Sequence, residues 1–154
     1  MVPVLQWGLP LPALTNPLEE RFGYQLRRAS VVLMAELAGR MADLGLTITE
    51  ASILVLIRAN PGANQTELSH TLAIKRANMV PLIAGLEDRG LVQRRLADGR
   101  SHALQLSKTG AVLAAKADLA MQTHDAQLLS TLSRAAQRQM LRQFAAIRAQ
   151  GEKV

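Results

Sequence analysis

The stretch LVQRRLADGRSHALQLSKTG, residues 91–110, constrains the fold of this chain more than any other part of it. Two short runs of alternating side chains flank Asp98-Gly99, a dipeptide typical of hairpin turns. An isolated two-stranded hairpin is only marginally stable in water, so this one must pack against a body formed by the rest of the chain. Arginines on its first strand and at its tip also indicate that the exposed side of the hairpin binds a partner.

The register of the hairpin follows from its side-chain pattern. Asp98-Gly99 alone favours a two-residue turn, but that turn would mix apolar and polar side chains on both faces. A loop with an odd number of residues separates them, and a slip of one residue would reverse every side chain. The apolar face then carries Val92, Leu96, Leu104 and Leu106, and the other face carries Gln93, Arg95, Ala97, Ser101 and Gln105. We therefore expect Arg100 at the tip, Arg95 toward solvent, and Arg94 on the apolar face in a structural ion pair.

Two capping boxes open short helices ahead of the hairpin. In each, a side-chain acceptor is followed three residues later by a glutamate, and the two residues satisfy each other's backbone N–H groups. Thr47 with Glu50 opens the first helix, and Asn64 with Glu67 opens the second. Asn60-Pro61-Gly62 separates them, because proline and glycine interrupt helices. The sequence thus predicts two short helices in close succession.

The stretch AIKRANMVPLIAGLEDRG predicts a further short helix, which Gly90 ends. Its inward stripe consists of Met79, Leu82, Ile83 and Leu86. Short helices joined by tight connections and followed by a hairpin are the pattern of a winged helix-turn-helix, in which the hairpin is the wing. These helices form the core against which we expect the hairpin to pack.

Longer helices are expected on both sides of this core. Asn16-Pro17 has the signature of a helix start, and apolar residues recur from there to Gly45 at steps of three and four. Another helix follows the hairpin from about Lys108, and Ser133 caps the last one. The predicted fold class is therefore mainly α with a small β-hairpin wing: a winged helix-turn-helix core flanked by N- and C-terminal helices, to which a dimerisation role is assigned below.

The last helix has an apolar side that a helix added to a small domain could hardly bury alone. We expect a homodimer held by the helices of residues 16–45 and 108–150, which flank a winged helix-turn-helix region at 46–107. Residues 1–15 are interpreted as an irregular arm, because three prolines interrupt them. The expected interface residues are Leu18, Phe22, Met140, Leu141, Phe144 and Ile147.

The positive charge of the chain is concentrated in two segments. The net charge of +6 comes from residues 74–110, with seven basic and three acidic side chains, and residues 131–154, with five and one, because the rest of the chain is net negative. Such clustering favours a polyanion-binding surface, with a solvated face as the alternative. The absence of cysteine excludes disulfides and thiolate zinc sites, and the three histidines lie too far apart for a metal site. No apolar run is long enough to cross a bilayer.

A helical wheel of the helix that precedes the hairpin places small residues opposite its buried stripe. This smooth ridge consists of Ala77, Pro81, Ala84, Gly85 and Asp88. The ridge suits the major groove of DNA, with Arg76 and Asn78 reaching base edges and Lys75 just before them. The alternative is close packing against another protein element. With the basic wing beside it, DNA is the preferred interpretation.

Further DNA contacts are expected on the preceding short helix and on the wing. Gln65 and Thr66 offer backbone N–H groups and a hydroxyl, which suit a phosphate, although plain helix capping is an equal alternative. Arg95 adds a charge on the solvent face of the wing. Arg100 is expected to enter the minor groove while Asp98 steadies its guanidinium, and an exposed ion pair without a partner is the alternative.

Four stretches of this region stand in a characteristic order. They are LTITEASILVLI, QTELSHTL, LEDRGLV and a wing pattern D-x-R followed by L-[ST]-x-x-G, here Asp98, Arg100, Leu106, Ser107 and Gly110. Together they resemble the MarR family of winged-helix transcriptional regulators, over roughly residues 18–148. The chain departs from the family pattern at Val80 and Pro81, where a polar residue and then arginine are frequent, and at Gly99, where a second arginine is common.

The resemblance implies a symmetric dimer whose N- and C-terminal helices form the interface and which binds pseudo-palindromic DNA. It also implies a repressor that a small, often aromatic or phenolic, ligand releases. We therefore predict a sequence-specific, double-stranded DNA-binding transcriptional regulator of the cytoplasm that needs no cofactor. The alternative is an architectural DNA-binding or protein-interaction module without a ligand.

An enzyme is not expected from the motifs of the chain. Lys108-Thr109-Gly110 matches one penicillin-binding motif, but no S-x-x-K accompanies it. No glycine-rich phosphate loop and no G-x-S-x-G is present either. The sequence assigns no residues to an effector pocket or to a metal.

Overall fold

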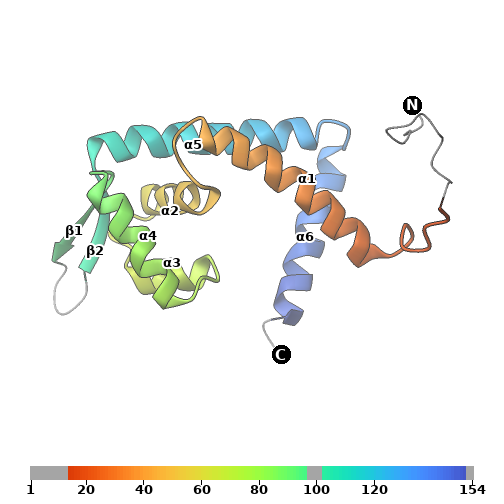
Figure 1. Ribbon diagram of the computed structural model, residues 1–154, viewed down its shortest axis with the longest axis horizontal. Coiled ribbons are helices and arrows are strands. Elements are labelled where there is room, and N and C mark those ends of the chain that lie inside the picture. Colours follow the sequence, from red (N-terminus) through yellow and green to blue (C-terminus); the bar gives the residue numbers. More distant parts are fainter. Residues whose placement is uncertain (1–13, 97–101, 152–154) are drawn as a thin grey trace, which may run out of the picture. The chain divides into compact units, whose positions relative to one another are not determined.

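The computed structural model describes residues 14–96 and 102–151. The elements along this part of the chain (Figure 1) are α1 Phe22–Ala42, α2 Ile48–Ala59, α3 Gln65–Thr71, α4 Arg76–Asp88, β1 Val92–Leu96, β2 His102–Leu106, α5 Lys108–Leu128 and α6 Arg134–Gly151. The architecture is mainly α with one antiparallel two-stranded sheet, as predicted. The chain divides into two compact units, residues 1–36 and 37–154. Within the described ranges, no helix has the length and hydropathy that a membrane span requires.

The start of the first helix differs from the prediction. α1 begins at Phe22 and not at Asn16-Pro17. The Leu18 N–H donates to Asn16 Oδ1 over 3.1 Å, and the Glu19 N–H donates to the Asn16 carbonyl over 3.2 Å. The asparagine therefore closes a tight turn ahead of the helix, because its side chain serves turns as readily as helix caps. Leu18 and Phe22, both predicted interface residues, are 48% and 66% exposed.

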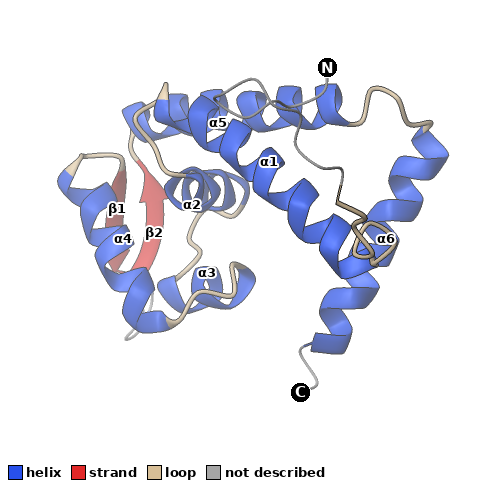
Figure 2. Cartoon of the chain, turned by 45° about the vertical axis from the view of Figure 1, so that its right-hand side comes forward, coloured by secondary structure: helices blue, strands red, loops and turns tan. Residues whose placement is uncertain are grey.

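Both capping boxes form as predicted and open α2 and α3. The Thr47 hydroxyl accepts from the Glu50 N–H over 3.1 Å, and the Glu50 carboxylate accepts from the Thr47 N–H over 2.7 Å. Asn64 and Glu67 exchange the same bonds at 3.0 and 2.8 Å. Figure 2 shows α2, α3 and α4 around the hairpin. The apolar core that these elements share with α5 includes Ile53, Leu54, Ile57, Met79, Ile83, Leu86, Val92, Leu104, Ala114 and Ala117.

The hairpin has the register that its side-chain pattern predicts. Arg94 lies opposite Leu104, so the connecting loop has an odd number of residues. Leu104 is buried, whereas Arg95 on the other face is exposed. The Gly62 N–H donates to the Leu104 carbonyl over 3.1 Å, and the Leu104 N–H donates to the Ala63 carbonyl over 3.0 Å. These bonds fasten the wing to the segment that leads into α3.

A close approach of two backbone segments explains the glycine that ends the wing pattern. The Ser107 N–H donates to the Leu91 carbonyl over 3.0 Å, and Ser107 Oγ caps α5 by accepting from the Gly110 N–H over 2.9 Å. A Cβ atom on Gly110 would lie 1.9 Å from the Leu91 carbonyl oxygen. Glycine is needed here because any side chain would collide with the backbone before the wing.

The last helix exposes the apolar side chains predicted for it. Ser133 caps its start by accepting a backbone N–H over 3.2 Å. No side chain of α6 is buried. Met140, Leu141 and Ile147 are 39%, 64% and 41% exposed, and Phe144 is half-buried. Such an apolar row is typical of an interaction surface, while its assignment to a dimer interface stays a prediction.

Candidate nucleic-acid interface

The N-terminal half of α4 presents one side to solvent. Met79, Ile83 and Leu86 are buried and anchor the helix. We define the α4 surface as its exposed residues up to the middle of the helix, together with the residue before it: Lys75, Arg76, Ala77, Asn78, Val80 and Pro81. The predicted ridge is interrupted after Pro81, because Ala84 and Gly85 are half-buried, whereas its last residue, Asp88, is exposed.

The start of α4 differs electrostatically from the starts of α2 and α3. Those two helices have capping boxes with a glutamate in the first turn, whereas α4 has neither a side-chain cap nor an acidic residue there. Lys75 at the N-cap and Arg76 at the first helical position add to the partial positive charge of the helix end. This end of α4 is therefore the better anion-attracting helix start of the three.

Arg89, at the other end of α4, has a structural task. Its guanidinium pairs with Glu50 over 3.0 Å and donates to the Gly45 carbonyl over 2.8 Å. Burial by itself raises the pKa of Glu50, but hydrogen bonds from Thr47 and the charge of Arg89 outweigh it and hold this pKa below its ordinary value. The glutamate therefore stays charged, and the pair ties the end of α4 to the start of α2.

The other cations of α4 and the wing fall into two groups. Arg94 donates to Glu87 over 2.9 Å, which confirms the predicted structural ion pair. Lys75, Arg76 and Arg95 are exposed and have no acidic partner among the residues that the structure describes. Their charges are thus available to a polyanion.

The structure supports the other predicted DNA contacts, on α3 and at the tip of the wing, only in part. The capping box of α3 leaves the N–H groups of Gln65 and Thr66 without a bond to the described part of the chain. Thr66 is exposed and Gln65 is half-buried. Capping at this helix start is confirmed, and the phosphate contact stays a prediction. Asp98 and Arg100 fall in residues 97–101, outside the described residues.

Val80 belongs to the α4 surface although the sequence did not place it in a DNA-binding site. It is 46% exposed and lies one helical turn after Arg76. The helical wheel shows which residues oppose the buried stripe, but it does not show how deeply a helix packs. The signal that was available is the i, i+4 spacing from Arg76, which puts both residues on the same side of the helix.

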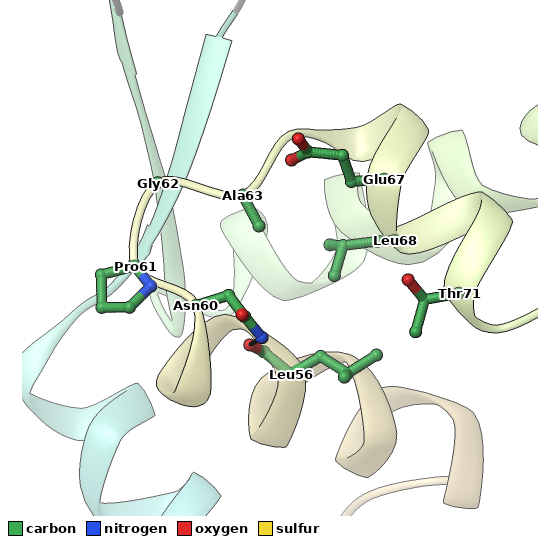
Figure 3. Close-up of a pocket in the computed structure, with 8 residues that line it drawn as sticks. All are labelled: Leu56, Asn60, Pro61, Gly62, Ala63, Glu67, Leu68 and Thr71. Atoms are coloured by element: carbon green, nitrogen blue, oxygen red, sulfur yellow. Dashed lines mark hydrogen bonds between the residues drawn. The ribbon is translucent and has the colours of Figure 1, made fainter.

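A pocket of about 610 Å³ lies between the end of α2 and α3 (Figure 3). Leu56 on α2 faces Leu68 and Thr71 on α3, and residues 60–63 close one side. Glu67 is the only charged residue among the described residues that line it, so this part of the chain offers the pocket no cation for an anionic ligand. In the part of the chain that the structure describes, no three histidine, cysteine, aspartate or glutamate residues gather as a metal site.

Known proteins are similar to this chain in sequence and in fold. A model of the MarR family matches residues 46–102. The HTH-type transcriptional repressor Rv2887 of Mycobacterium tuberculosis is 32% identical over 122 residues, which cover 78% of this chain and 88% of the repressor. The solved transcriptional repressor CouR bound to a 23-mer DNA duplex is 36% identical, with a TM-score of 0.79 over 89% of this chain and 99% of that chain. CouR bound to p-coumaroyl-CoA is 34% identical, with a TM-score of 0.76 over 88% and 97%.

Proposed function

The chain belongs to the MarR family, and from this premise we propose that it is a sequence-specific transcriptional repressor that binds double-stranded DNA. The family consists of DNA-binding regulators and is not a family of enzymes. One observation of the structure carries the proposal: Lys75 and Arg76 are exposed at an uncapped helix start that has no acidic residue. Such an end favours the phosphates and acceptor groups of DNA.

Each residue of the α4 surface that the sequence predicted receives a role from its chemistry. Arg76 and Asn78 read base edges in the major groove, because guanidinium and amide groups bond to guanine and adenine there. Ala77 and Pro81 have little bulk, which lets the helix approach the base pairs. Lys75, at the N-cap, contacts a phosphate.

Further contacts to the DNA backbone and to the minor groove come from the wing and from α3. Arg95, on the solvent face of the wing, reaches a phosphate. Arg100 enters the minor groove, with Asp98 beside its guanidinium. Gln65 and Thr66 give backbone N–H groups to another phosphate. These contacts position the protein, while α4 reads the sequence.

The regulator is a homodimer that recognises a pseudo-palindromic operator in the cytoplasm. Support comes from apolar side chains of α1 and α6 that one copy leaves in water. Residues 16–45 and 108–150 form the dimerisation region, 46–107 the DNA-binding region, and 1–15 an arm. The proposed interface residues are Leu18, Phe22, Met140, Leu141, Phe144 and Ile147.

A small aromatic or phenolic ligand releases the repressor from DNA. This part rests on CouR, which has been solved both with a DNA duplex and with p-coumaroyl-CoA. An architectural or interaction module without a ligand is the alternative. A thermal-shift series with aromatic acids and their thioesters separates the two. A raised unfolding midpoint together with weaker operator binding supports release, and no response to any compound supports the alternative.

Selection of bound sequences from random duplex DNA tests the main function. The full-length protein is expected to enrich a pseudo-palindrome whose half-sites lie about one helical turn, roughly 10 base pairs, apart. The matched control is Arg76→Ala, which should enrich a more degenerate half-site. Recovery of unrelated sequences at physiological salt would contradict sequence-specific recognition.

A further inference from the structure

The exposure of Val80 is not explained by the core of α4 or by phosphate binding. Its neighbours Met79 and Ile83 are fully buried, whereas the valine is 46% exposed. Valine also forms helices less well than alanine does, so helix stability gives no reason for it at an exposed position. The flanking residues Ala77 and Pro81 are small, which leaves the two valine methyl groups accessible.

We propose that Val80 is a specificity-determining residue that recognises thymine through its C5-methyl group. The inference rests on the proposed function and deepens it. In the major groove only thymine presents a methyl group, and apolar side chains contact it. Arg76 lies four residues earlier on the same side of the helix, so a helix that delivers Arg76 to a base edge also delivers Val80.

The spacing of the two side chains limits where the thymine lies. Four residues of an α-helix rise about 6 Å. Successive base pairs are about 3.4 Å apart. The thymine that Val80 contacts therefore lies no more than about two base pairs along the duplex from the base that Arg76 reads.

The surroundings of Val80 favour DNA over a second protein. The first two turns of α4 contain no acidic residue, and Lys75 and Arg76 stand at their start. Val80 is the one large apolar residue of α4 that is strongly exposed. A stable protein interface buries about 800 Å² on each partner, which a single valine does not approach. A single valine side chain does, however, have the size to contact the single methyl group of one thymine.

The test replaces thymine by uracil in the selected operator, which removes only the C5-methyl group. At one position of each half-site, the wild type is expected to lose about fourfold in affinity per substituted half-site, the equivalent of one buried methyl group. Val80→Ala should bind the thymine operator about fourfold more weakly per half-site and should not respond to uracil at that position. This non-additivity identifies a direct contact.

Val112→Ala is the matched control, because Val112 is an exposed valine (58%) on α5, outside the α4 surface. This variant should keep the full uracil response. If Val80→Ala keeps it as well, or if the wild type binds its operator but ignores uracil at every position, the inference fails while the proposed function stands. A Val80→Ala variant that alters dimer dissociation and leaves base preference intact would also overturn it. If the wild type bound no DNA at all, both the inference and the proposed function would be wrong.

Discussion

Arg76 and Arg94 carry the same guanidinium group, but their surroundings give them different tasks. Arg94 is held by Glu87 at 2.9 Å, whereas Arg76 is exposed at the start of α4. Arg76→Ala is expected to cost about 1–3 kcal/mol of binding free energy on the preferred operator and to relax specificity at one base pair. Arg94→Ala, the control, should lower the free energy of unfolding and leave base preference unchanged. Competition against base-substituted operators measures both, and an equal loss on every sequence would make Arg76 a phosphate contact.

Gly110 is required because a side chain at this position would collide with a neighbouring backbone segment, and not because of the conformational freedom of glycine. An alanine there would place Cβ 1.9 Å from the Leu91 carbonyl oxygen, so the backbone at the base of the wing must move. We expect Gly110→Ala to lower the free energy of unfolding by about 1–3 kcal/mol or more, measured by denaturant titration. Gly85→Ala is the control, since a Cβ there meets nothing within 4 Å and should stabilise α4 by about 0.5–1 kcal/mol. Equal effects of the two variants would refute the steric account.

At the scale of elements, the turn between α3 and α4 holds a strained residue. Ala73 has a φ of 52°, in the left-handed region, where its N–H donates to the His70 carbonyl over 3.1 Å. Glycine adopts this conformation without the Cβ penalty. Ala73→Gly is therefore expected to raise the free energy of unfolding by about 0.5–1 kcal/mol. Ala84→Gly, within α4, should lower it by about 1 kcal/mol, and a loss of stability in both variants would contradict strain at Ala73.

Local signals in the sequence were sufficient for most element boundaries. The Thr47 and Asn64 boxes formed as predicted because each needs only residues three apart. The pairing of Arg94 was predicted because the alternation of side chains determines the face on which it lies. The start of α1 was wrong because an asparagine before proline closes a turn as well as it caps a helix.

The remaining features depend on contacts between distant parts of the chain. The exposure of Val80 is set by how α4 packs on the core, and the need for Gly110 is set by the backbone at Leu91. The left-handed conformation of Ala73 could not be predicted from the sequence either, because glycine is the usual residue at such a position. A single sequence contains no local pattern for any of these three.

At the scale of the whole molecule, the exposed apolar side of α6 predicts self-association. Light scattering at micromolar concentration should give the mass of a dimer, because Leu141 is 64% exposed in one copy. Leu141→Glu is expected to shift the protein toward monomer, since a carboxylate in an apolar interface loses its hydration. Val80→Glu, also an exposed apolar position but on α4, should stay dimeric. A wild type that is monomeric at this concentration would reject the dimer.

The salt dependence of operator binding tests the central claim, that a basic surface of α4 and the wing binds DNA. Lys75 and Arg95 at phosphates and Arg100 in the minor groove supply three positive charges per subunit that neutralise phosphate charge, so a dimer should show a slope of log affinity against log salt concentration of about −5. Lys75→Ala should reduce the magnitude of this slope by about 2, because each dimer loses two contacts. A wild-type affinity that does not change with salt concentration would contradict the account.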